Sequence, residues 1–513
     1  MGKLSWARQT SLTLVAWLAS AVILCAQTFT TLHSFDGTDG FDPVSGLTQA
    51  TDGNLYGLTT AGGSNEVGTL FRVTPNGTFA LLHIFSVEEG NTPYGPLIQA
   101  DDGNFYGTTS IGPESHGFYG YGTVFKMSPS GVLTTLYTFC SQANCADGAF
   151  PMAGLVQGAD GNLYGTTVAG GANPCWLLDT PDAGCGTVFR ITPGGKLTTL
   201  YSFGSQDGDG VNPYAGLVQG VDGAFYGTTY SGGLNNVCVQ KYTSSCGTVF
   251  KITPSGALTT LHSFCSEPGC ADGALPMTGL VQATNGGLYG ATIAGANGFA
   301  GGGDAGLGDG TLFRISPSGA LKTLHSFCSE TGCEDGGSSG TLLQASDGNL
   351  YGAGGGGANA NGEVFELTLG GTFTTAYSFC DPYNDDGCTA GAGAQALIQD
   401  TNGRFYATTA YGGTSGACDY DYGCGTAFAL GIGLTPFVEA RPAAAKVGKA
   451  IDILGSSLKG ASSVTFNGVG ATFTVESPSL IRATVPVGAT TGLVQVTTPQ
   501  RTLKSNVPFR VVR

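Results

Sequence analysis

Apolar and polar residues alternate along most of the chain in short runs that end at turn-forming residues. A block such as GLVQGADGNLYGTT is followed by a variable segment and then by GTVFRITPGGKLTTLYSF, and both blocks recur with small changes. Alternation with a period of two residues is typical of half-buried strands. Long helical patterns are absent, and 87 of the 513 residues are glycine. The pattern predicts an all-β protein made of many short strands joined by tight turns.

A tyrosine in the first block marks seven copies of the repeat. It recurs at Tyr56, Tyr106, Tyr164, Tyr226, Tyr289, Tyr351 and Tyr406. Every first block turns at Asp-Gly or Asn-Gly, which tolerate the positive φ of a tight hairpin, and most second blocks turn at Pro-x-Gly. We expect four strands per repeat, A to D. The A–B and C–D turns then share one face, and the variable B–C loops and D–A crossings share the other.

The strand count predicts how the repeats close into a ring. The D sequence TTLHSF occurs once before the first A strand, at Thr30 to Phe35, whereas the last repeat ends after its C strand, which begins at Gly425. The N-terminal segment can supply the missing outer strand and leave no unpaired edge. Residues 27–433 are therefore predicted to form a seven-bladed β-propeller in which the N-terminal strand closes the last blade.

Two segments carry family resemblances. The repeated motifs LHSF, DGNLYGTT and GTVFKITPSG resemble the Gloeo/Verruco tandem repeat of bacterial exported proteins, which implies export and a propeller-like fold but supplies no catalytic residues. After residue 433 the repeat stops, and ILGSSL, VTFNG and ATVPVGATTG are similar to the IPT/TIG immunoglobulin-like domain. Residues 434–513 are thus predicted to form a small β-sandwich. The resemblance implies a spacer or an interaction module.

The first residues have the order of a secretory signal. Lys3 and Arg8 precede an apolar stretch from Leu12 to Leu24, and cleavage is expected after Ala26. Residues 1–26 are therefore predicted to be a signal peptide. No later stretch approaches the roughly 20 apolar residues of a membrane helix. We expect a secreted or cell-surface protein, with no integral membrane segment once the signal is removed.

Charge is divided unevenly along the chain. Residues 27–435 contain 9 Lys/Arg and 33 Asp/Glu, whereas residues 436–513 contain 9 and 3. Such an acidic propeller would repel a polyanion, so nucleic acid is excluded as its partner. By strand assignment, 24 of the 33 acids fall in D–A crossings or B–C loops, where Lys241 is the only basic residue. This loop face is the candidate functional surface, because binding residues concentrate on variable loops of a rigid scaffold.

Fourteen cysteines follow the predicted signal, and they form near-neighbour pairs within single loops. In an exported protein this pattern predicts disulfides, whereas a zinc site would need histidine partners or C-x₂-C spacing. The predicted pairs are Cys140 with Cys145, Cys175 with Cys185, Cys238 with Cys246, Cys265 with Cys270, Cys328 with Cys333, Cys380 with Cys388, and Cys418 with Cys424.

An acidic residue followed by glycine occurs in every D–A crossing. One interpretation is that acidic-Gly forms the turn into strand A. The other is that the seven acids ring the channel mouth and hold a ligand or a cation such as Ca²⁺, which takes carboxylate oxygens. The acids are Asp39, Glu89, Asp147, Asp209, Asp272, Asp335 and Asp386.

Catalytic motifs are missing from the sequence. Four of the five histidines (His33, His83, His262 and His325) occupy a position where other repeats have tyrosine, which predicts a packing role. No G-x-S-x-G, H-E-x-x-H or G-x-x-x-x-G-K motif occurs. We therefore expect a monomeric, non-catalytic protein that needs no cofactor and binds an extracellular glycan, protein or cation. The alternative is a secreted polysaccharide hydrolase or lyase with carboxylates at the channel mouth. A quinone-dependent dehydrogenase is disfavoured, since Trp176 is the only tryptophan after residue 26.

Overall fold

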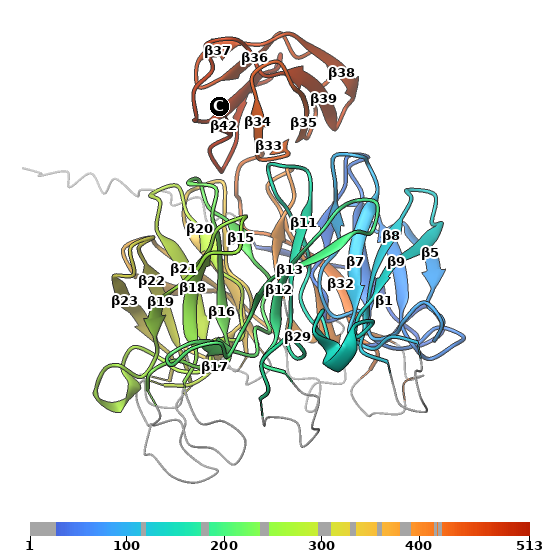
Figure 1. Cartoon of the computed structure of the whole chain (residues 1–513). Coiled ribbons are helices and arrows are strands. Elements are labelled where there is room, and N and C mark those ends of the chain that lie inside the picture. Colours follow the sequence, from blue (N-terminus) through green and yellow to red (C-terminus); the bar gives the residue numbers. More distant parts are fainter. Residues whose placement is uncertain are drawn as a thin grey trace, which may run out of the picture.

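The computed structural model (Figure 1) describes residues 27–113, 120–175, 184–235, 246–295, 309–328, 335–355, 362–379, 391–394, 396–414, 418 and 423–512. Regular structure in these ranges is strand, apart from two 3₁₀ turns, η1 (Ala143–Cys145) and η2 (Pro268–Cys270). No helix among these residues is long and apolar enough to cross a membrane. The prediction of an all-β protein is confirmed. The predicted signal lies outside the described residues and stays a prediction.

Seven antiparallel sheets of four or five strands lie between residues 28 and 431 of the described chain. The first five are β2 (Thr48–Gln49), β3 (Leu55–Thr59), β4 (Thr69–Val73) and β5 (Phe79–Ile84); β6 (Ile98–Gln99), β7 (Phe105–Thr109), β8 (Thr123–Met127) and β9 (Leu133–Thr138); β10 (Val156–Gln157), β11 (Leu163–Thr167), β12 (Thr187–Ile191) and β13 (Leu197–Ser202); β15 (Val218–Gln219), β16 (Phe225–Thr229), β18 (Thr248–Ile252) and β19 (Leu258–Ser263); and β20 (Val281–Gln282), β21 (Leu288–Thr292), β22 (Thr311–Ile315) and β23 (Leu321–Ser326).

The last two sheets each contain one further short strand. The sixth comprises β24 (Gly337–Ser339), β25 (Leu343–Gln344), β26 (Leu350–Gly355), β27 (Glu363–Leu367) and β28 (Phe373–Ser378), and the seventh comprises β29 (Ala392–Ala394), β30 (Ile398–Gln399), β31 (Phe405–Tyr411), β32 (Thr426–Gly431) and β1 (Thr28–Ser34). A separate pair, β14 (Gly210–Val211) and β17 (Ser231–Gly232), extends the fourth repeat.

The N-terminal strand completes the seventh sheet, as the sequence predicts. β1 runs antiparallel to β32, with Phe29 opposite Leu430 and Ser34 opposite Thr426. The edge of the last repeat is therefore paired with a segment about 400 positions earlier in the chain. Such pairing removes an open edge that would otherwise be available to other chains.

Apolar side chains join each sheet to the next. The second strand of every sheet is buried along almost its whole length because it lies between neighbours on both sides. Six buried clusters each combine residues of two consecutive repeats. A seventh cluster packs Phe35 and Tyr406 of the last sheet against Leu55 and Phe71 of the first. The arrangement is propeller-like, with its core between the sheets.

A ring of side-chain hydrogen bonds also connects the seven repeats. In each sheet the two-residue strand before the A–B turn ends in a glutamine whose Oε1 accepts a hydrogen bond from a backbone N–H of the neighbouring repeat, at 2.8–3.2 Å. In six repeats its Nε2 donates to the carbonyl of the glycine in its own A–B turn. This glutamine ring consists of Gln49, Gln99, Gln157, Gln219, Gln282, Gln344 and Gln399.

Residues 434–512, the C-terminal unit, contain two four-stranded antiparallel sheets around one apolar cluster that includes Val438, Phe466 and Ile481. The strands are β33 (Val438–Arg441), β35 (Ala450–Gly455), β39 (Leu480–Thr484) and β38 (Phe473–Ser477) in one sheet, β37 (Val469–Gly470), β36 (Ser463–Phe466), β40 (Val494–Thr497) and β41 (Thr502–Lys504) in the other, and the parallel pair β34 (Ala444–Lys446) and β42 (Arg510–Val512).

The C-terminal unit lies across the face that carries the A–B turns (Figure 1). The guanidinium of Arg441 donates to the carbonyl of Gln49. Asn506 Nδ2 donates to Gln399 Oε1 at 3.2 Å, and Arg510 Nη2 donates to Gln219 Oε1 at 3.1 Å. The unit therefore touches the glutamine ring at the first, fourth and seventh repeats.

Candidate functional site

Each described acid of the acidic-Gly series is paired with an aromatic side chain of its own D strand, in five cases through a hydrogen bond that the acid accepts. The hydrogen-bond partners are His33 for Asp39, His83 for Glu89, Tyr137 for Asp147, Tyr201 for Asp209 and His262 for Asp272, at 2.6–3.1 Å. In the sixth case His325 Nε2 and Asp335 Oδ2 are 3.2 Å apart and form an ion pair. Asp386 lies outside the described residues. The histidines therefore do more than pack. Histidine Nε2 and tyrosine Oη both lie at the far end of the ring, which explains why the two residue types exchange at this position.

Asp272 illustrates how such a carboxylate orders its crossing. Its Oδ2 accepts from His262 Nε2 at 2.9 Å and from the backbone N–H and hydroxyl of Ser266 at 3.0 and 2.8 Å. Burial raises the pKa of Asp272, but these hydrogen bonds outweigh it and hold the pKa below its usual range. The carboxylate thus fixes the path of the chain from strand D toward the next strand A.

In the first five repeats the glycine after the acid makes room for a pair of threonines, and in the seventh Gly391 takes this place. In six repeats the last B-strand threonine and the first C-strand threonine share a hydrogen bond of 2.8–3.0 Å, as Thr292 and Thr311 do. A Cβ on Gly273 would lie 2.5 Å from the hydroxyl oxygens of both Thr292 and Thr311. Acidic-Gly is therefore a packing requirement as well as a turn.

The sixth repeat departs from this pattern. Gly354 and Glu363 replace the threonine pair. Glu363 is fully buried, its Oε2 accepts from Thr375 at 2.7 Å, and its Oε1 has no hydrogen-bond partner within the described part of the chain. Burial raises its pKa, and the charge of Asp335 adds to the shift. The sixth repeat thus differs from the other six at Gly354 and Glu363. Gly354 and its neighbour Gly355 line the cavity described below.

Four of the predicted cysteine pairs are disulfides in the structure: Cys140–Cys145, Cys175–Cys185, Cys265–Cys270 and Cys418–Cys424. Cys246 and Cys328 are also disulfide-bonded. The disulfides occupy the D–A crossings and B–C loops, as the sequence predicts.

The remaining predicted cysteines lie outside the described residues. They are Cys238, the predicted partner of Cys246, and Cys333, the predicted partner of Cys328. Both members of the sixth predicted pair, Cys380 and Cys388, also lie there. The bond between Cys380 and Cys388 therefore stays a prediction.

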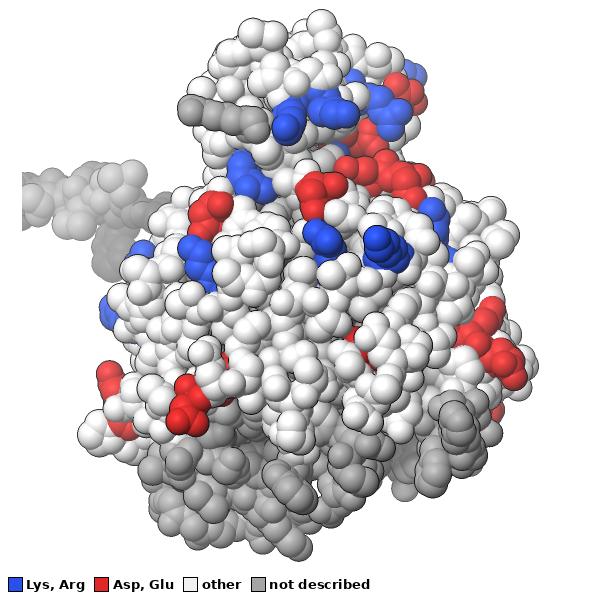
Figure 2. Space-filling model, in the orientation of Figure 1, with Lys and Arg blue, Asp and Glu red and all other residues white. Residues whose placement is uncertain are grey.

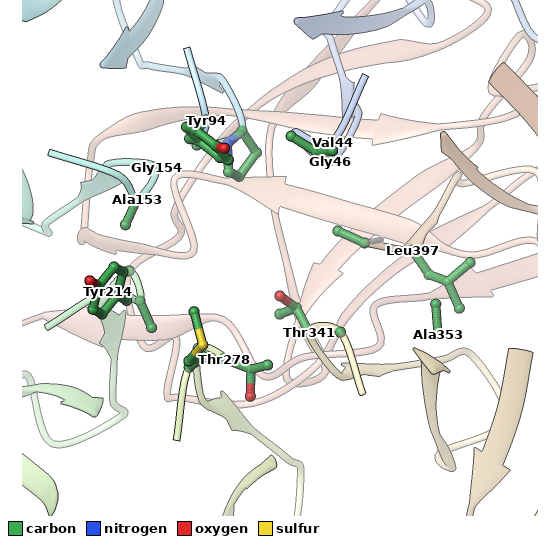
Figure 3. Close-up of a pocket in the computed structure, with 18 of the residues that line it drawn as sticks. Val44, Gly46, Tyr94, Ala153, Gly154, Tyr214, Thr278, Thr341, Ala353 and Leu397 are labelled. Atoms are coloured by element: carbon green, nitrogen blue, oxygen red, sulfur yellow. The ribbon is translucent and has the colours of Figure 1, made fainter. Parts of the chain in front are cut away.

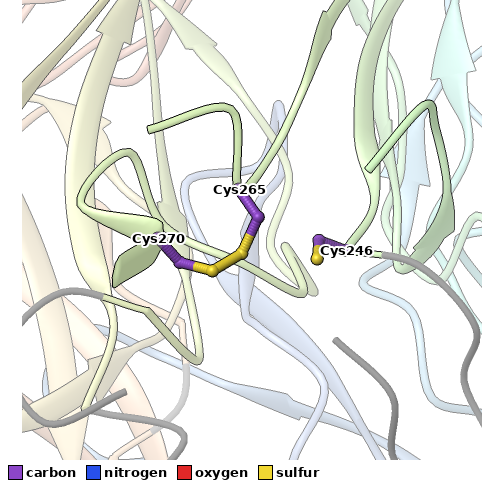
Figure 4. A group of neighbouring side chains, drawn as sticks. All are labelled: Cys246, Cys265 and Cys270. Atoms are coloured by element: carbon purple, nitrogen blue, oxygen red, sulfur yellow. A yellow bond between two sulfur atoms is a disulfide. The ribbon is translucent and has the colours of Figure 1, made fainter. Parts of the chain in front are cut away.

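Three buried sulfurs gather where two of these loops meet (Figure 4). The Sγ atoms of Cys246, Cys265 and Cys270 all lie within 4.8 Å of one another. Metals bind thiolates, whereas all three cysteines are already in disulfides. The cluster is therefore a structural part of the loop face and not a metal centre.

A central cavity of about 910 Å³ receives residues from all seven repeats (Figure 3). Its wall consists mainly of the first strands and of the residues just before them. Side chains at its loop-face end include Tyr94, Met152, Tyr214 and Met277, and Tyr94 and Met277 are each 40% exposed. No sequence motif pointed to these residues. The available signal was their shared position, three residues before the leucine that directly precedes strand A. This position varies between repeats in a block that is otherwise repeated.

The described residues that line the central cavity are apolar, glycine, or hydroxyl-bearing, and none carries a charge. None of the six described acids of the acidic-Gly series is among them. Among the described acids, Asp42 affects Tyr94, a residue of the cavity wall. Burial raises the pKa of Tyr94, and the negative charge of Asp42 raises it further. Calcium binding by the acidic-Gly series stays a prediction.

Charge separates the two faces of the ring. Basic and acidic side chains mix at the junction with the C-terminal unit, whereas only acidic ones are visible toward the loop side in Figure 2. Among described residues the crossings and B–C loops contain no Lys or Arg. Their described acids are Asp36, Asp39, Asp42, Glu66, Glu88, Glu89, Asp147, Asp207, Asp209, Glu267, Asp272, Asp309 and Asp335.

Comparison with known proteins gives one family match. The model of the Gloeobacter/Verrucomicrobia repeat matches residues 21–178, 114–333 and 240–431. No curated protein matches the sequence.

Among solved structures, the chain is similar to the extracellular domain of a protein assigned as a hybrid two-component system from B. thetaiotaomicron. The identity is 12% and the TM-score is 0.48, and the match covers 84% of this chain and 46% of that one. It thus spans less than half the length of that domain. It is also similar to a luciferin-regenerating enzyme, at 9% identity and a TM-score of 0.40, over 80% of this chain and 97% of that one. A gluconolactonase from Xanthomonas campestris matches at 15% identity and a TM-score of 0.34, over 65% of this chain and 88% of that one.

Proposed function

This chain belongs to the Gloeobacter/Verrucomicrobia repeat family, and from that premise we propose that residues 27–433 form a seven-bladed β-propeller followed by an IPT/TIG-like β-sandwich in residues 434–513. The closed series of apolar clusters and the glutamine ring support the propeller. Two sheets around a single apolar cluster support the sandwich.

The protein acts as a secreted or cell-surface scaffold that binds an extracellular glycan or protein on its loop face. Disulfides and the hydrogen-bonded acids stiffen the crossings and B–C loops there, which lowers the entropy lost when those loops hold a ligand. The C-terminal unit occupies the opposite face and leaves the loop face open. Disulfide-rich loops suit an oxidising, extracellular location.

The observation that carries this proposal is the chemistry of the central cavity. A propeller hydrolase or lyase needs carboxylates that reach its substrate, whereas the described lining residues are uncharged. The six described acids of the acidic-Gly series are instead paired with D-strand aromatic side chains, five by hydrogen bonds and Asp335 by an ion pair. Binding therefore accounts for the site better than catalysis.

A glycan array and a panel of hydrolase and lyase substrates, run in parallel on residues 27–513, test the proposal. We expect saturable binding without turnover. Turnover that Asp42→Asn abolishes and Asp309→Asn retains would overturn it, because Asp42 lies near the cavity wall and Asp309 is an exposed loop acid.

A further inference from the structure

We infer that the central cavity is a binding site for a cationic amphiphile, with the apolar part of the ligand inside the cavity and its cationic group at the mouth beside Asp42 and Tyr94. This site goes beyond the proposed function, which concerns the loops. It rests on the shape, lining and charge of the cavity alone.

The cavity is covered at the end that faces the C-terminal unit. Asn506 and Arg510 of the C-terminal unit bind Gln399 and Gln219 of the glutamine ring, and Arg441 binds the carbonyl of Gln49. These contacts reach opposite parts of the ring, so the unit spans the mouth on the A–B turn face. Entry from the A–B turn face is therefore blocked, and we place the mouth of the cavity at the loop-face end, where Tyr94 is partly exposed.

The wall suits an apolar segment. Leu47, Leu97, Leu155, Leu217, Leu280 and Leu397 contribute to the lining, one from each of six repeats. A volume of about 910 Å³ lies within the roughly 300–1,000 Å³ typical of small-molecule sites. Because no described lining residue carries a charge, a charged ligand group would lose its hydration without gaining an ion pair inside. The charged end of an amphiphile would remain at the mouth.

The mouth favours a positive charge. The described crossings and B–C loops contain acids and no Lys or Arg, so the field at the entrance attracts cations. Tyr94 presents a partly exposed ring at the rim, and the face of an aromatic ring attracts an ammonium group. The carboxylate of Asp42 is held by the Thr60 hydroxyl at 2.7 Å. Thr60 and Pro93, the residue before Tyr94, both lie next to Gly68, so the carboxylate is close to Tyr94, whose pKa its charge raises.

The cavity is also asymmetric, which suits a single ligand. At the position three residues before the lining leucine, the second to fifth repeats contribute Tyr94, Met152, Tyr214 and Met277, whereas the first contributes Val44 and the seventh Ala394.

Calorimetric titration of residues 27–513 with decyltrimethylammonium, below its micelle concentration, tests the inference. We expect one saturable site for this probe and no binding of tetramethylammonium or decyl sulfate, with the near-ultraviolet circular dichroism unchanged. Equal binding of decyl sulfate would overturn the cationic preference. Binding of tetramethylammonium alone would overturn the role of the apolar wall.

Two variants locate the site. Gly279→Leu fills the cavity, since a Cβ at Gly279 meets nothing closer than 3.7 Å, and we expect it to abolish binding. Gly470→Leu makes the same change at an open position of the C-terminal unit and should retain binding. Asp42→Asn should weaken the binding of decyltrimethylammonium up to about five-fold, as expected for a partly exposed charge pair. Unchanged binding in Gly279→Leu would refute the site, whatever the glycan array shows for the loops.

Discussion

The side-chain Oε1 of Gln49 accepts a hydrogen bond from the backbone N–H of Thr401 at 3.2 Å, across 352 positions of the chain, and Gln49 Nε2 donates to the Thr401 hydroxyl at 3.1 Å. Equivalent glutamines make the other six connections of the ring. The link between Gln49 and Thr401 is the one that joins the last repeat back to the first. It complements the β1–β32 pairing at the outer edge of the same sheet.

Gln49→Leu should therefore destabilise the ring. The substitution keeps the size of the side chain but leaves the buried N–H of Thr401 without its acceptor, which costs about 1–3 kcal/mol. Chemical denaturation followed by tyrosine fluorescence measures the change. Gln500→Leu, at an exposed position of the C-terminal unit, is the matched control. Equal stability of the two variants would show that the ring adds nothing to the fold.

Asp272→Asn should lower the free energy of unfolding at pH 7 by about 1–2 kcal/mol, because a buried charge-assisted acceptor is lost. The folded-state pKa of Asp272 lies below its usual value of 3.8. Its stabilising contribution is therefore present above that value and is lost as the pH falls through the folded pKa. Unfolding measured from pH 7 to pH 3 should show the difference from wild type shrinking with acidity. Asp207→Asn, at an exposed acid of another crossing, should show no such trend.

Calcium should leave the melting temperature unchanged if the acidic-Gly carboxylates act as turn-forming acceptors. Their oxygens already accept hydrogen bonds from D-strand rings and crossing N–H groups. Thermal unfolding in EGTA and in millimolar calcium gives the comparison. A calcium-dependent rise that Asp272→Asn removes would instead establish these acids as a cation site.

The sequence was sufficient to predict the repeats and the pairing of β1 with β32, because both depend on local signals. Asp-Gly turns and alternating apolar residues fix each hairpin, and the unpaired TTLHSF segment at Thr30 to Phe35 matches the one missing D strand. Cysteine spacing was equally local, since each described disulfide closes a loop of at most 10 residues. Short-range patterns of this kind survive in a single sequence.

The glutamine ring and the position of the C-terminal unit could not be predicted in the same way. Gln49 ends a two-residue strand, so alternation alone makes it an ordinary surface residue, and its partner belongs to another repeat. The contact of Arg510 with Gln219 joins residues 291 positions apart without any repeated pattern. The sequence also did not show that the acidic-Gly carboxylates point toward aromatic side chains of the D strands. The exchange of histidine and tyrosine at the D-strand position was the signal that could have revealed it.

Restoring the threonine pair in the sixth repeat should stabilise the protein. The double variant Gly354→Thr/Glu363→Thr removes a buried carboxyl with an unpartnered oxygen and introduces the hydroxyl pair of the other six repeats. We expect a gain of about 1–3 kcal/mol at pH 7, measured by denaturant unfolding. Gly354→Thr alone should gain nothing, since the buried carboxyl of Glu363 is retained and the new hydroxyl has no threonine opposite it. Loss of stability in the double variant would indicate that Glu363 has a partner that the pattern does not reveal.

Asp400 lies where the C-terminal unit meets the ring, next to Thr401. It should make the free energy of unfolding depend on pH. Burial raises its pKa to about 6, and its Oδ2 is buried without a hydrogen-bond partner among the described residues. A raised acid pKa means that the folded state holds the proton more tightly than the unfolded state, so stability falls as the pH rises from about 4 to about 6.

Asp400→Ala introduces the residue found at this position in four other repeats, Ala50, Ala100, Ala283 and Ala345. It should raise the free energy of unfolding by roughly 1–3 kcal/mol at pH 7 and by less at pH 4. Thermal unfolding at both pH values measures this, with Asp309→Asn as the exposed control. A gain that is the same at the two pH values would show that the carboxylate is not the cause.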